Sequence, residues 1–479
     1  RGTFMSATIN FGRTLHIVGG LLGAFIVFVD STIVNVALPS LSVDFHASTA
    51  SLEWVINAYT LVFAAFLLSA GSLADVLGAR RIFLVGIIVF SLASVACATS
   101  SSISYLNVSR LVQGLGAALV LPSSLTIMTT DVTDERLRHR LVGFYAAAGG
   151  VGLAVGPLAG GLLIHGFGWP SIFWVNVGVG LIAFAAGLWP TPVSTRSQKK
   201  IDYFGQFFAT LAIASLVFAL VEAPERGWSD SLVITSLPLF VVTLTLFIFV
   251  ERYAHSPLLP LGLYRNAQFF GVIGLGFFFN FMFYGVLFAL SLYFQNGLGY
   301  NALLAGISFL PFTGLVTAGN LVAPRVAERT HRLHVLIFGE ALVAVSLLIG
   351  ALAGYCDLRL LLFAALLPGG FGSGLLVPTM TSQTLVTVPI DSHGSATAGF
   401  NTFRQLGGAF GVSIFGPLVA GVADVRGGFV ASLFVAAGAM AVSLIVAVCT
   451  QRPQRIYCDK LVEEQVGEGA PVTGTGSVR

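Results

Sequence analysis

Stretches of about 20 predominantly apolar residues recur along this chain of 479 residues and limit its fold more than any other feature. A helix of that length crosses the hydrocarbon core of a bilayer, which is about 30 Å thick. Only 9% of the residues are charged, whereas a soluble chain carries about a quarter. The sequence therefore predicts an all-α polytopic membrane protein.

We expect fourteen transmembrane helices, and this even number leaves both ends of the chain on one side of the membrane. Two of the 24 Lys and Arg residues fall inside the expected spans, and three lie in loops on the opposite side. The others share the side of the termini, so the positive-inside rule places both termini in the cytoplasm. A composition rich in Ala and Gly and poor in Lys favours a bacterial inner (plasma) membrane. The expected spans are 14–38, 52–74, 82–98, 104–128, 141–163, 171–190, 204–221, 232–250, 269–293, 302–322, 333–352, 360–382, 396–419 and 429–449.

An internal repeat indicates how the spans are organised. The segment Gly114-Leu-Gly-Ala-Ala-Leu-Val-Leu-Pro122 in the fourth span aligns with Gly370-Phe-Gly-Ser-Gly-Leu-Leu-Val-Pro378 in the twelfth. At the same offset, Gly143-Phe144 matches Gly399-Phe400. Matching spans run in the same direction, which predicts two six-helix bundles in a parallel repeat with a substrate site between them near the membrane midplane.

Two spans remain after six are assigned to each bundle, and they lie between the halves. We therefore divide the chain into four parts: an N-terminal six-helix bundle at 1–190, a basic linker with two inserted transmembrane helices at 191–266, a C-terminal six-helix bundle at 267–451, and a polar, disordered cytoplasmic tail at 452–479.

A stripe of glycines marks the fifth span. Gly152, Gly156 and Gly160 follow one another at four-residue spacing, with Pro157 and Gly161 beside them. Glycines at this spacing remove side chains from one helix face so that a neighbouring backbone can approach, and the proline bends the helix. We expect a bent, tightly packed helix, although such spacing also occurs wherever membrane helices pack.

Two charged residues inside spans are candidates for proton coupling. A carboxylate in a span costs at least about 2.5 kcal/mol to insert, so Asp30 needs a compensating role. The helical rise places Asp30 roughly 24 Å from the cytoplasmic end of the first span and Arg110 roughly 9 Å from the opposite end of the fourth, which are similar depths. A carboxylate between a cation and a desolvating environment can take up and release protons. The alternative is a static ion pair that braces two helices.

A charged turn follows the second span. Asp75 precedes Arg80 and Arg81 across a turn that contains Gly78. A carboxylate there can cap a helix amino terminus and hold the loop against a neighbouring helix. We expect these residues to latch the outward-open state, in which the cytoplasmic side is closed, and the alternative is a solvated loop that only sets topology.

The second half carries a buried acid and a buried base. Glu340 and Arg404 lie at similar depths, roughly 10 and 12 Å from the cytoplasmic ends of their spans. Glu340 is a candidate for a second proton or cation site, with structural pairing or snorkelling as the alternative. Glu53, close to the outer end of the second span, is expected to be an interfacial charge.

Some aromatic and amide residues are candidates for lining a substrate cavity. Phe281 and Tyr284 belong to an aromatic run in the ninth span that suits flat lipophilic cations, or that faces lipid. Asn35, Tyr59 and Gln113 are the other candidates.

Several classes of function are excluded by what the sequence lacks. The four cysteines form no CxxC pair or cluster, which argues against a metal site. There is no Walker-type phosphate-binding motif and no nucleophile cluster, so we expect no enzyme and no cofactor. The net charge of +3 is not arranged as a basic stripe, so we expect no nucleic-acid partner.

Four motifs follow one another along the chain: Val29-Asp-Ser-Thr-Ile-Val-Asn-Val-Ala-Leu-Pro39, Gly71-Ser-Leu-Ala-Asp-Val-Leu-Gly-Ala-Arg-Arg81, Arg110-Leu-Val-Gln-Gly-Leu-Gly-Ala117 and the glycine-proline run 149–161. With these motifs the chain resembles the major facilitator superfamily and, within it, the fourteen-span drug:proton antiporters. Weaker matches include Trp54 with Tyr59 and the segments 173–176, 293–295 and 404–408, and one departure is Val76, where that family usually has a basic residue.

The resemblance implies a monomeric antiporter in the lipid bilayer that exports amphipathic organic compounds such as drugs, dyes and antibiotics. The proton gradient would drive alternating access, with no cofactor. Two alternatives stay open: an exporter of one endogenous metabolite (a lipid, siderophore, amino acid or self-made antibiotic), and a proton-coupled uptake symporter of the same fold. The glycine-proline run, a motif associated with exporters, disfavours the symporter.

Overall fold

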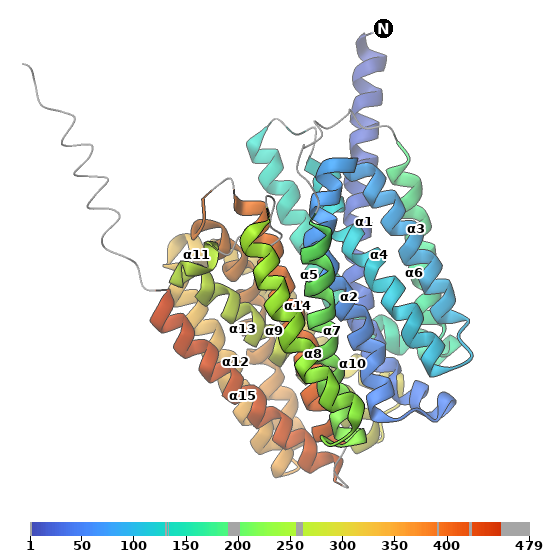
Figure 1. Ribbon diagram of the computed structural model, residues 1–479, viewed down its shortest axis with the longest axis vertical. Coiled ribbons are helices and arrows are strands. Elements are labelled where there is room, and N and C mark those ends of the chain that lie inside the picture. The colour runs from blue at the N-terminus through green and yellow to red at the C-terminus, as the bar shows by residue number, and fades with distance from the viewer. Residues whose placement is uncertain are drawn as a thin grey trace, which may run out of the picture.

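The computed structural model describes residues 2–129, 132, 134–189, 202–254, 262–389, 392–420 and 424–451. Every regular element in these ranges is helical (Figure 1). The basic linker expected after residue 190 and the tail expected at 452–479 lie outside the described residues.

The first bundle comprises six helices that pack around α1 and α4. The first helix contacts α4, α5 and α6, and α4 packs against α2 and α3. Its elements are α1 (Gly2–Phe45), α2 (Thr49–Leu77), α3 (Ala79–Ala98), α4 (Ile103–Thr129), α5 (Glu135–Phe167) and α6 (Ser171–Gly187).

The second bundle repeats this packing pattern. Here α9 contacts α13, α14 and α15, and α13 packs against α11 and α12. One expected span is interrupted at Phe309, because Pro311 lacks the backbone donor that would continue the preceding helix and instead starts the next one. The elements are α9 (Ala267–Leu292), its π-helical extension η2 (Tyr293–Gly297), α10 (Ala302–Ser308), α11 (Leu310–Arg329), α12 (Arg332–Tyr355), α13 (Arg359–Val386), α14 (His393–Ala420) and α15 (Val425–Thr450).

The glycines of the sequence repeat occupy equivalent positions in the two bundles. A Cβ atom on Gly114 of α4 would lie 2.4 Å from the carbonyl oxygen of Tyr59 on α2. A Cβ atom on Gly370 of α13 would lie 2.4 Å from the carbonyl oxygen of Phe312 on α11. Only glycine fits at such helix crossings, so the repeated sequence reflects a repeated close approach of backbones. The residue boundaries of the four expected parts stay a prediction.

The two helices between the bundles are α7 (Tyr203–Arg226) and α8 (Ser231–Tyr253), and a short helical turn, η1 (Leu263–Arg265), precedes α9. α7 packs against α2 of the first bundle and α14 of the second, and α8 packs against α7. Much of α8 is apolar and exposed, as expected for a lipid-facing helix.

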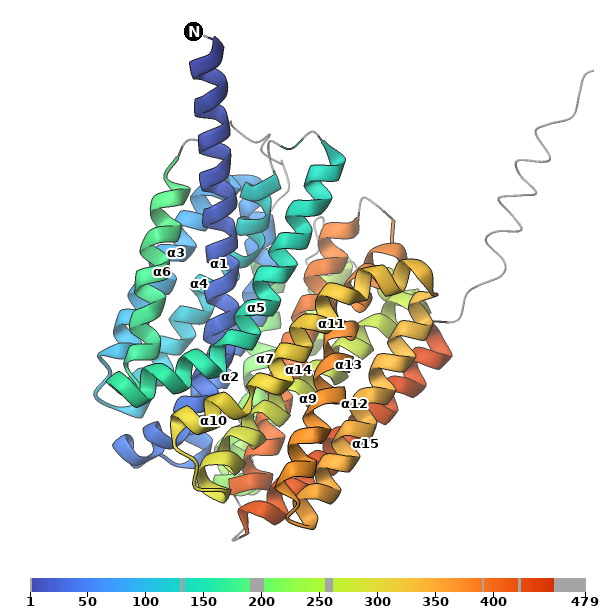
Figure 2. The same ribbon diagram turned by 180° about the vertical axis from the view of Figure 1, so that it is seen from behind.

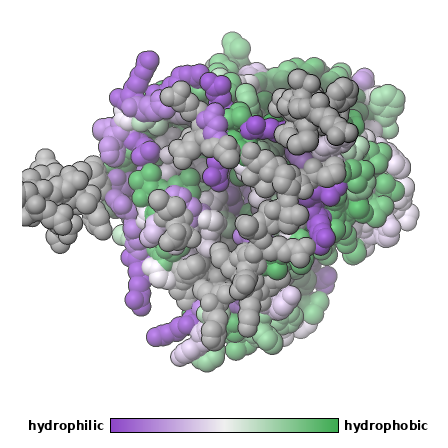
Figure 3. All heavy atoms as spheres, turned by 90° about the horizontal axis from the view of Figure 1, so that it is seen from above, coloured by the Kyte–Doolittle hydropathy of each residue, from purple (hydrophilic) through white to green (hydrophobic). Residues whose placement is uncertain are grey.

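Twelve described segments are long and apolar enough to cross a membrane. They do not include α6, which has only 17 residues, or α14, whose sequence contains several polar residues between His393 and Gln405. The expected count of fourteen spans is therefore not confirmed. Hydrophilic residues spread over the end of the molecule that carries the N-terminus (Figure 3), consistent with a surface outside the hydrocarbon core.

The two bundles lie side by side and touch mainly from the middle of the molecule to the end opposite the N-terminus (Figure 2). The hydroxyl of Ser291 on α9 donates to the backbone oxygen of Asn35 on α1 at 2.6 Å, and Asn57 on α2 donates to Ser413 on α14 at 2.9 Å. Both pairs lie toward that opposite end. In this conformation the halves are therefore closed against each other at that end.

Candidate functional site

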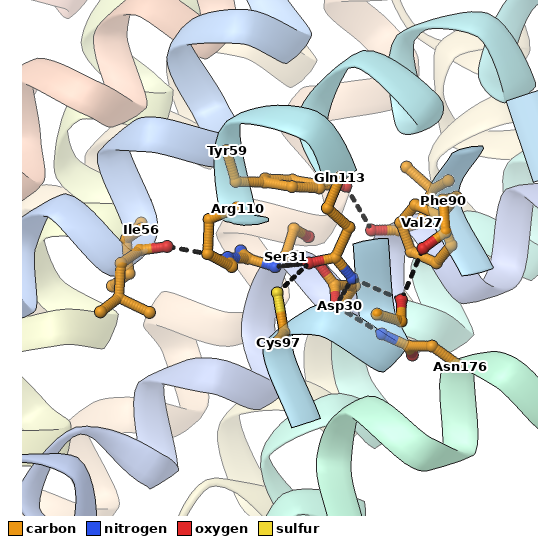
Figure 4. A network of polar contacts seen from close by, with 12 residues as sticks. Val27, Asp30, Ser31, Ile56, Tyr59, Phe90, Cys97, Arg110, Gln113 and Asn176 are labelled. Atoms are coloured by element: carbon orange, nitrogen blue, oxygen red, sulfur yellow. Dashed lines mark hydrogen bonds and ion pairs between the residues drawn. The ribbon is translucent and has the colours of Figure 1, made fainter. Parts of the chain in front are cut away.

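Asp30 and Arg110 form a buried ion pair inside the first bundle (Figure 4). Nη1 of Arg110 lies 2.6 Å from Oδ2 of Asp30, and the two side chains are 1% and 0% exposed. The depth estimates from the sequence are thus consistent with direct contact between α1 and α4. Such a charge-assisted hydrogen bond is strong, and removing one member of a buried pair typically costs about 3–5 kcal/mol.

Two amide side chains complete the shell around the Asp30 carboxylate. Oδ1 accepts hydrogen bonds from Gln113 on α4 at 2.9 Å and from Asn176 on α6 at 2.6 Å. Oε1 of Gln113 in turn accepts from Nη1 of Arg110 at 2.6 Å. Asp30 therefore accepts hydrogen bonds from three side-chain donors on two neighbouring helices.

The network extends beyond the carboxylate to α2 and α3. Nε of Arg110 donates to the backbone oxygen of Val55 at 2.8 Å, and its guanidinium lies 4.3 Å from the centre of the Tyr59 ring. Gln113 also donates to Ser94 at 2.9 Å. The Asp30 carboxylate is thus connected directly to α4 and α6, and through Arg110 and Gln113 to α2 and α3, so a change in its charge would act on contacts with these four helices.

The candidates for cavity lining are packed rather than open in this conformation. Asn35, Tyr59 and Gln113 are buried, and Asn35 lies where the two halves meet. Phe281 packs edge-on against Phe415, and Tyr284, half-buried on α9, lies beside Gly408 of α14. An apolar pocket exists instead within the second bundle, where Phe283, Phe312 and Leu347 contribute to its wall. The role of the five candidates stays a prediction.

The glycine stripe of α5 lies against α1. A Cβ atom on Gly152 would lie 2.8 Å from the backbone oxygen of Phe25, and one on Gly156 would lie 2.0 Å from Oγ1 of Thr32. Gly160 approaches Ile33 in the same way, with its Cβ position 3.0 Å from the backbone oxygen.

The end of the stripe reaches the other half of the molecule. The Cβ position of Gly161 is 2.6 Å from the backbone oxygen of Ala302, and that of Gly306 on α10 is 2.6 Å from the backbone oxygen of Pro157. α5 therefore joins α1 on one face and α10 on another, and both approaches depend on the absence of side chains.

The charged turn between α2 and α3 is only partly engaged. Arg80 donates from Nε to the backbone oxygen of Gly187 at 2.9 Å and from Nη2 to that of Leu188, which satisfies carbonyls at the end of α6. Gly78, which precedes α3, adopts φ +98° and carries no side chain that could cap this helix. The capping role expected of Asp75 stays a prediction.

Other residues of this motif lie in the helices on either side of the turn and are loosely packed. Asp75, in the last turn of α2, and Arg81, in the first turn of α3, are exposed, and a Cβ atom on Gly71 of α2 would meet nothing within 4 Å. The turn lies at the end of the first bundle where the N-terminus is, away from the closed contact between the halves (Figure 2). The latch role stays a prediction for a conformation closed at this end.

Glu340 and Arg404 do not pair with each other in the structure. Glu340 on α12 is 1% exposed and accepts a hydrogen bond from Ser443 on α15 at 2.8 Å. Arg404 on α14 donates to Asn280 on α9 at 3.3 Å and lies 5.5 Å from the centre of the Phe400 ring. Similar depth in the membrane did not imply that the two side chains share a face of the bundle.

The prediction that Glu53 is an interfacial charge is wrong. The side chain is 0% exposed, because α14 covers the face of α2 from which it projects. Neither carboxylate oxygen has a hydrogen-bond partner among the described residues. The position of Glu53 along its helix could be estimated from the sequence, but the sequence did not show which other helix covers its side chain.

Asn176 is another residue that sequence reasoning did not select as part of the site. It is the only amide side chain in α6, a 17-residue helix whose remaining residues are almost all apolar. A lone amide in an apolar helix of a membrane protein needs a buried partner, and that signal could have identified it.

Comparison with known proteins now gives the family. The model of the Major Facilitator Superfamily matches residues 20–412, so the chain belongs to the major facilitator superfamily. The resemblance seen in the motifs is confirmed, and membership makes the chain a membrane transporter of small molecules rather than an enzyme.

Individual relatives refine the comparison. The chain is 32% identical over 431 residues to a methylenomycin A resistance protein of Bacillus subtilis, covering 87% of this chain and 90% of that protein. It is 34% identical to a tetracenomycin C resistance and export protein of Streptomyces glaucescens, covering 83% of this chain and 74% of the relative. A crystal structure of a D-xylose-proton symporter has the same fold, with a TM-score of 0.64 at 15% identity over 91% of this chain and 97% of the other.

Proposed function

We propose that this transporter is a proton-coupled antiporter that exports amphipathic organic compounds, with drugs and antibiotics among them. The single observation that carries the proposal is the buried Asp30 carboxylate and its three side-chain donors. A charge so expensive to bury in a membrane protein indicates a functional group, and its shell can rearrange when a proton binds.

The relatives support export as the direction of transport. They are named for resistance to methylenomycin A and for resistance to and export of tetracenomycin C. Resistance by transport requires that the compound leaves the cytoplasm. The glycine stripe of α5 belongs to a glycine-proline run that matches a motif associated with exporters, which agrees with this direction.

The arrangement of the halves supports alternating access. Three described hydrogen bonds between the bundles, Ser291 with Asn35, Gln295 with Val36 and Asn57 with Ser413, lie toward the end opposite the N-terminus, and a fourth, from Thr402 to the Ala64 carbonyl, lies near the middle of α2. With both termini in the cytoplasm of a bacterial inner membrane, as the charge distribution predicts, this conformation is closed on the outer side. Export then requires a second state that is closed on the cytoplasmic side.

The proposal includes a monomer without a cofactor, powered by the proton gradient. In the cycle, the substrate and the proton act oppositely on Asp30. When Asp30 binds a proton, its contact with Arg110 weakens, and one of the two conformations is favoured. When substrate binds, the other conformation is favoured.

Everted membrane vesicles test this function. Vesicles that contain the protein are energised to acidify their lumen, and the accumulation of compounds from a panel of dyes and antibiotics is measured. We expect accumulation that a protonophore abolishes. If accumulation does not depend on the pH gradient, the result contradicts proton coupling. If the compounds move only out of the everted vesicles, the protein is an uptake symporter.

The variant Asp30→Asn tests the residue that carries the proposal. We expect gradient-driven accumulation to fall by at least about tenfold, because the amide keeps the size of the side chain but cannot carry a proton on and off. Asp357→Asn is the matched control, since Asp357 is exposed and its φ of +57° suits Asn equally well. Membrane yield and gel-filtration behaviour check that both variants are folded.

A further inference from the structure

Glu53 has no role in the transport cycle proposed above. It projects from the first turns of α2 toward α14, where a Cβ atom on Gly416 would lie 2.1 Å from Oε1 of the acid. The carboxyl group thus lies directly against the backbone of a helix from the other half. It is 0% exposed, and both oxygens lack hydrogen-bond partners within the described residues.

The burial of Glu53 depends on contact between the two halves. One helical turn further along α2, Asn57 donates to Ser413 of α14 at 2.9 Å, so these positions belong to one seam between the bundles. If α2 and α14 separate at this end, water reaches the carboxyl group. If they close again, the carboxyl group is buried again against Gly416.

No described cation balances Glu53. The charged groups that act on it are Glu222 and Glu225 of α7, and Glu222 already pairs with Arg226 at 2.5 Å and accepts from Trp54 at 2.8 Å. On α14, residues 409–420 contain no titratable side chain.

On the opposite side of α2, the guanidinium of Arg110 is directed at the Val55 carbonyl and at Asp30. Glu53 therefore meets apolar surface and like charge. Both disfavour a bare carboxylate, and a neutral acid is the form that fits the closed seam.

We propose that Glu53 is a proton-binding site whose occupancy is tied to closure of the α2–α14 seam. When the seam closes, an O–H bond forms on the carboxylate with a proton taken from water on that side. When it opens, the proton returns to water and the carboxylate becomes hydrated. Acidity at that face therefore favours the closed seam, and alkaline conditions favour the open one.

The inference rests on the proposed function for the motion that opens the seam, but its test needs no transported compound. Spin labels on cysteines introduced at Ser101, between α3 and α4, and at Asn296, in η2, report the separation by pulsed electron paramagnetic resonance, because both residues are exposed at this end of the two halves. Cys356, Cys449 and Cys458 are replaced by Ser to avoid labelling elsewhere. The protein is studied in lipid nanodiscs between about pH 5 and about pH 9, a range that brackets the pKa values expected of perturbed carboxyl groups.

With Glu53 intact, the short distance should dominate at acidic pH, and the closed-to-open ratio should fall by up to about tenfold per pH unit once the site titrates. Glu53→Gln should stay closed across the range, because a neutral amide has no proton to lose. Glu225→Gln is the matched control: this neighbouring acid is exposed, so its removal should at most shift the pH at which the seam opens and should leave the opening itself in place.

Two results overturn the proposal. One is an intact protein whose label distance does not change with pH, a measurement that does not depend on recovering any variant of Glu53. The other is a Glu53→Gln protein that opens with pH as the intact one does. Either result leaves export in vesicles untouched, whereas a pH-dependent seam in a protein that transports nothing would contradict the proposed function alone.

Discussion

At the scale of single residues, the side chain of Arg110 holds two roles at once. Its Nη1 contacts both Asp30 and Gln113 at 2.6 Å, and its Nε donates to the Val55 carbonyl. The contact with Asp30 is therefore made through one nitrogen and not through the planar fork. The charge, more than the shape of the guanidinium, is what the carboxylate receives.

Replacement of Arg110 distinguishes two roles of its side chain: promoting proton release from Asp30, and bracing the bundle. In Arg110→Ala the carboxylate of Asp30 loses its cation, so proton release becomes harder and transport in vesicles should be lost near neutral pH. Activity should return in part at alkaline pH, where the acid can ionise again. A pH profile that only scales down, without an alkaline shift, would show that Arg110 braces the bundle.

Arg110→Lys is the companion variant. The single ammonium nitrogen of Lys can keep the contact with Asp30 but replaces the two separate nitrogens with which Arg110 reaches Asp30 and the Val55 carbonyl, so we expect partial activity at neutral pH. The comparison of the two variants by the same vesicle assay distinguishes loss of charge from loss of packing.

For single residues, the sequence predicted how far a side chain lies along its helix, but not which neighbouring helix it faces. The rise per residue fixes how far a side chain lies along a helix, and this brought Asp30 and Arg110 to one level. It cannot fix the rotation of one helix against another. For that reason Glu340 and Arg404 were matched in depth but do not pair, and the burial of Glu53 under α14 was not foreseen.

At the scale of helices, the contacts of α5 depend on positions that carry no side chain. Its glycine positions approach backbone atoms of α1 and α10 so closely that a methyl group has no room. Inserting atoms into a well-packed contact typically costs about 1–3 kcal/mol through displaced backbones.

Substitution of Gly156 tests this packing. We expect Gly156→Leu to reduce both membrane yield and efflux, because its side chain would meet Thr32 and the backbone of Val29 and Ile33. Gly143→Leu on the same helix is the control, since a Cβ atom there meets nothing within 4 Å. If Gly156→Leu matches the control in yield and efflux, the close approach of α5 to α1 is dispensable.

The periodicity of apolar residues predicted the helices well and their ends less well. The tenth expected span is divided into α10 and α11, although Pro311 in the sequence marks the point of interruption. α14 carries Asn401, Thr402 and Arg404 in its interior, and its polarity is tolerated because the helix packs between α9 and α2. Such burial depends on partners that a single helix does not reveal.

At the scale of the whole molecule, the inserted helix α7 is tied to the first half. Near one end, Gln206 donates to the Ala65 carbonyl of α2 at 2.9 Å and accepts from Ser69. Near the other end, Trp54 of α2 donates to Glu222 at 2.8 Å. The two inserted helices should therefore move together with the first bundle when the halves rock.

Disulfide cross-links test which half carries α7. A pair of cysteines in place of Ser69 and Gln206 should form a disulfide that leaves efflux intact, because these side chains belong to one moving body. Cysteines in place of Val217 and Ala409, which share an apolar cluster between α7 and α14, should block efflux when they are joined by a short cross-linker. Efflux blocked by the first link and tolerated with the second would assign α7 to the other half.

The contact between α7 and α14 has a consequence for the speed of the cycle. In the described part of the chain it consists of apolar side chains such as Val217, Val221 and Ala409. Sliding along such a surface exchanges one set of van der Waals contacts for another without breaking a hydrogen bond. The inserted helices can thus shield the lipid-facing side of the seam while adding little to the activation barrier between its closed and open forms.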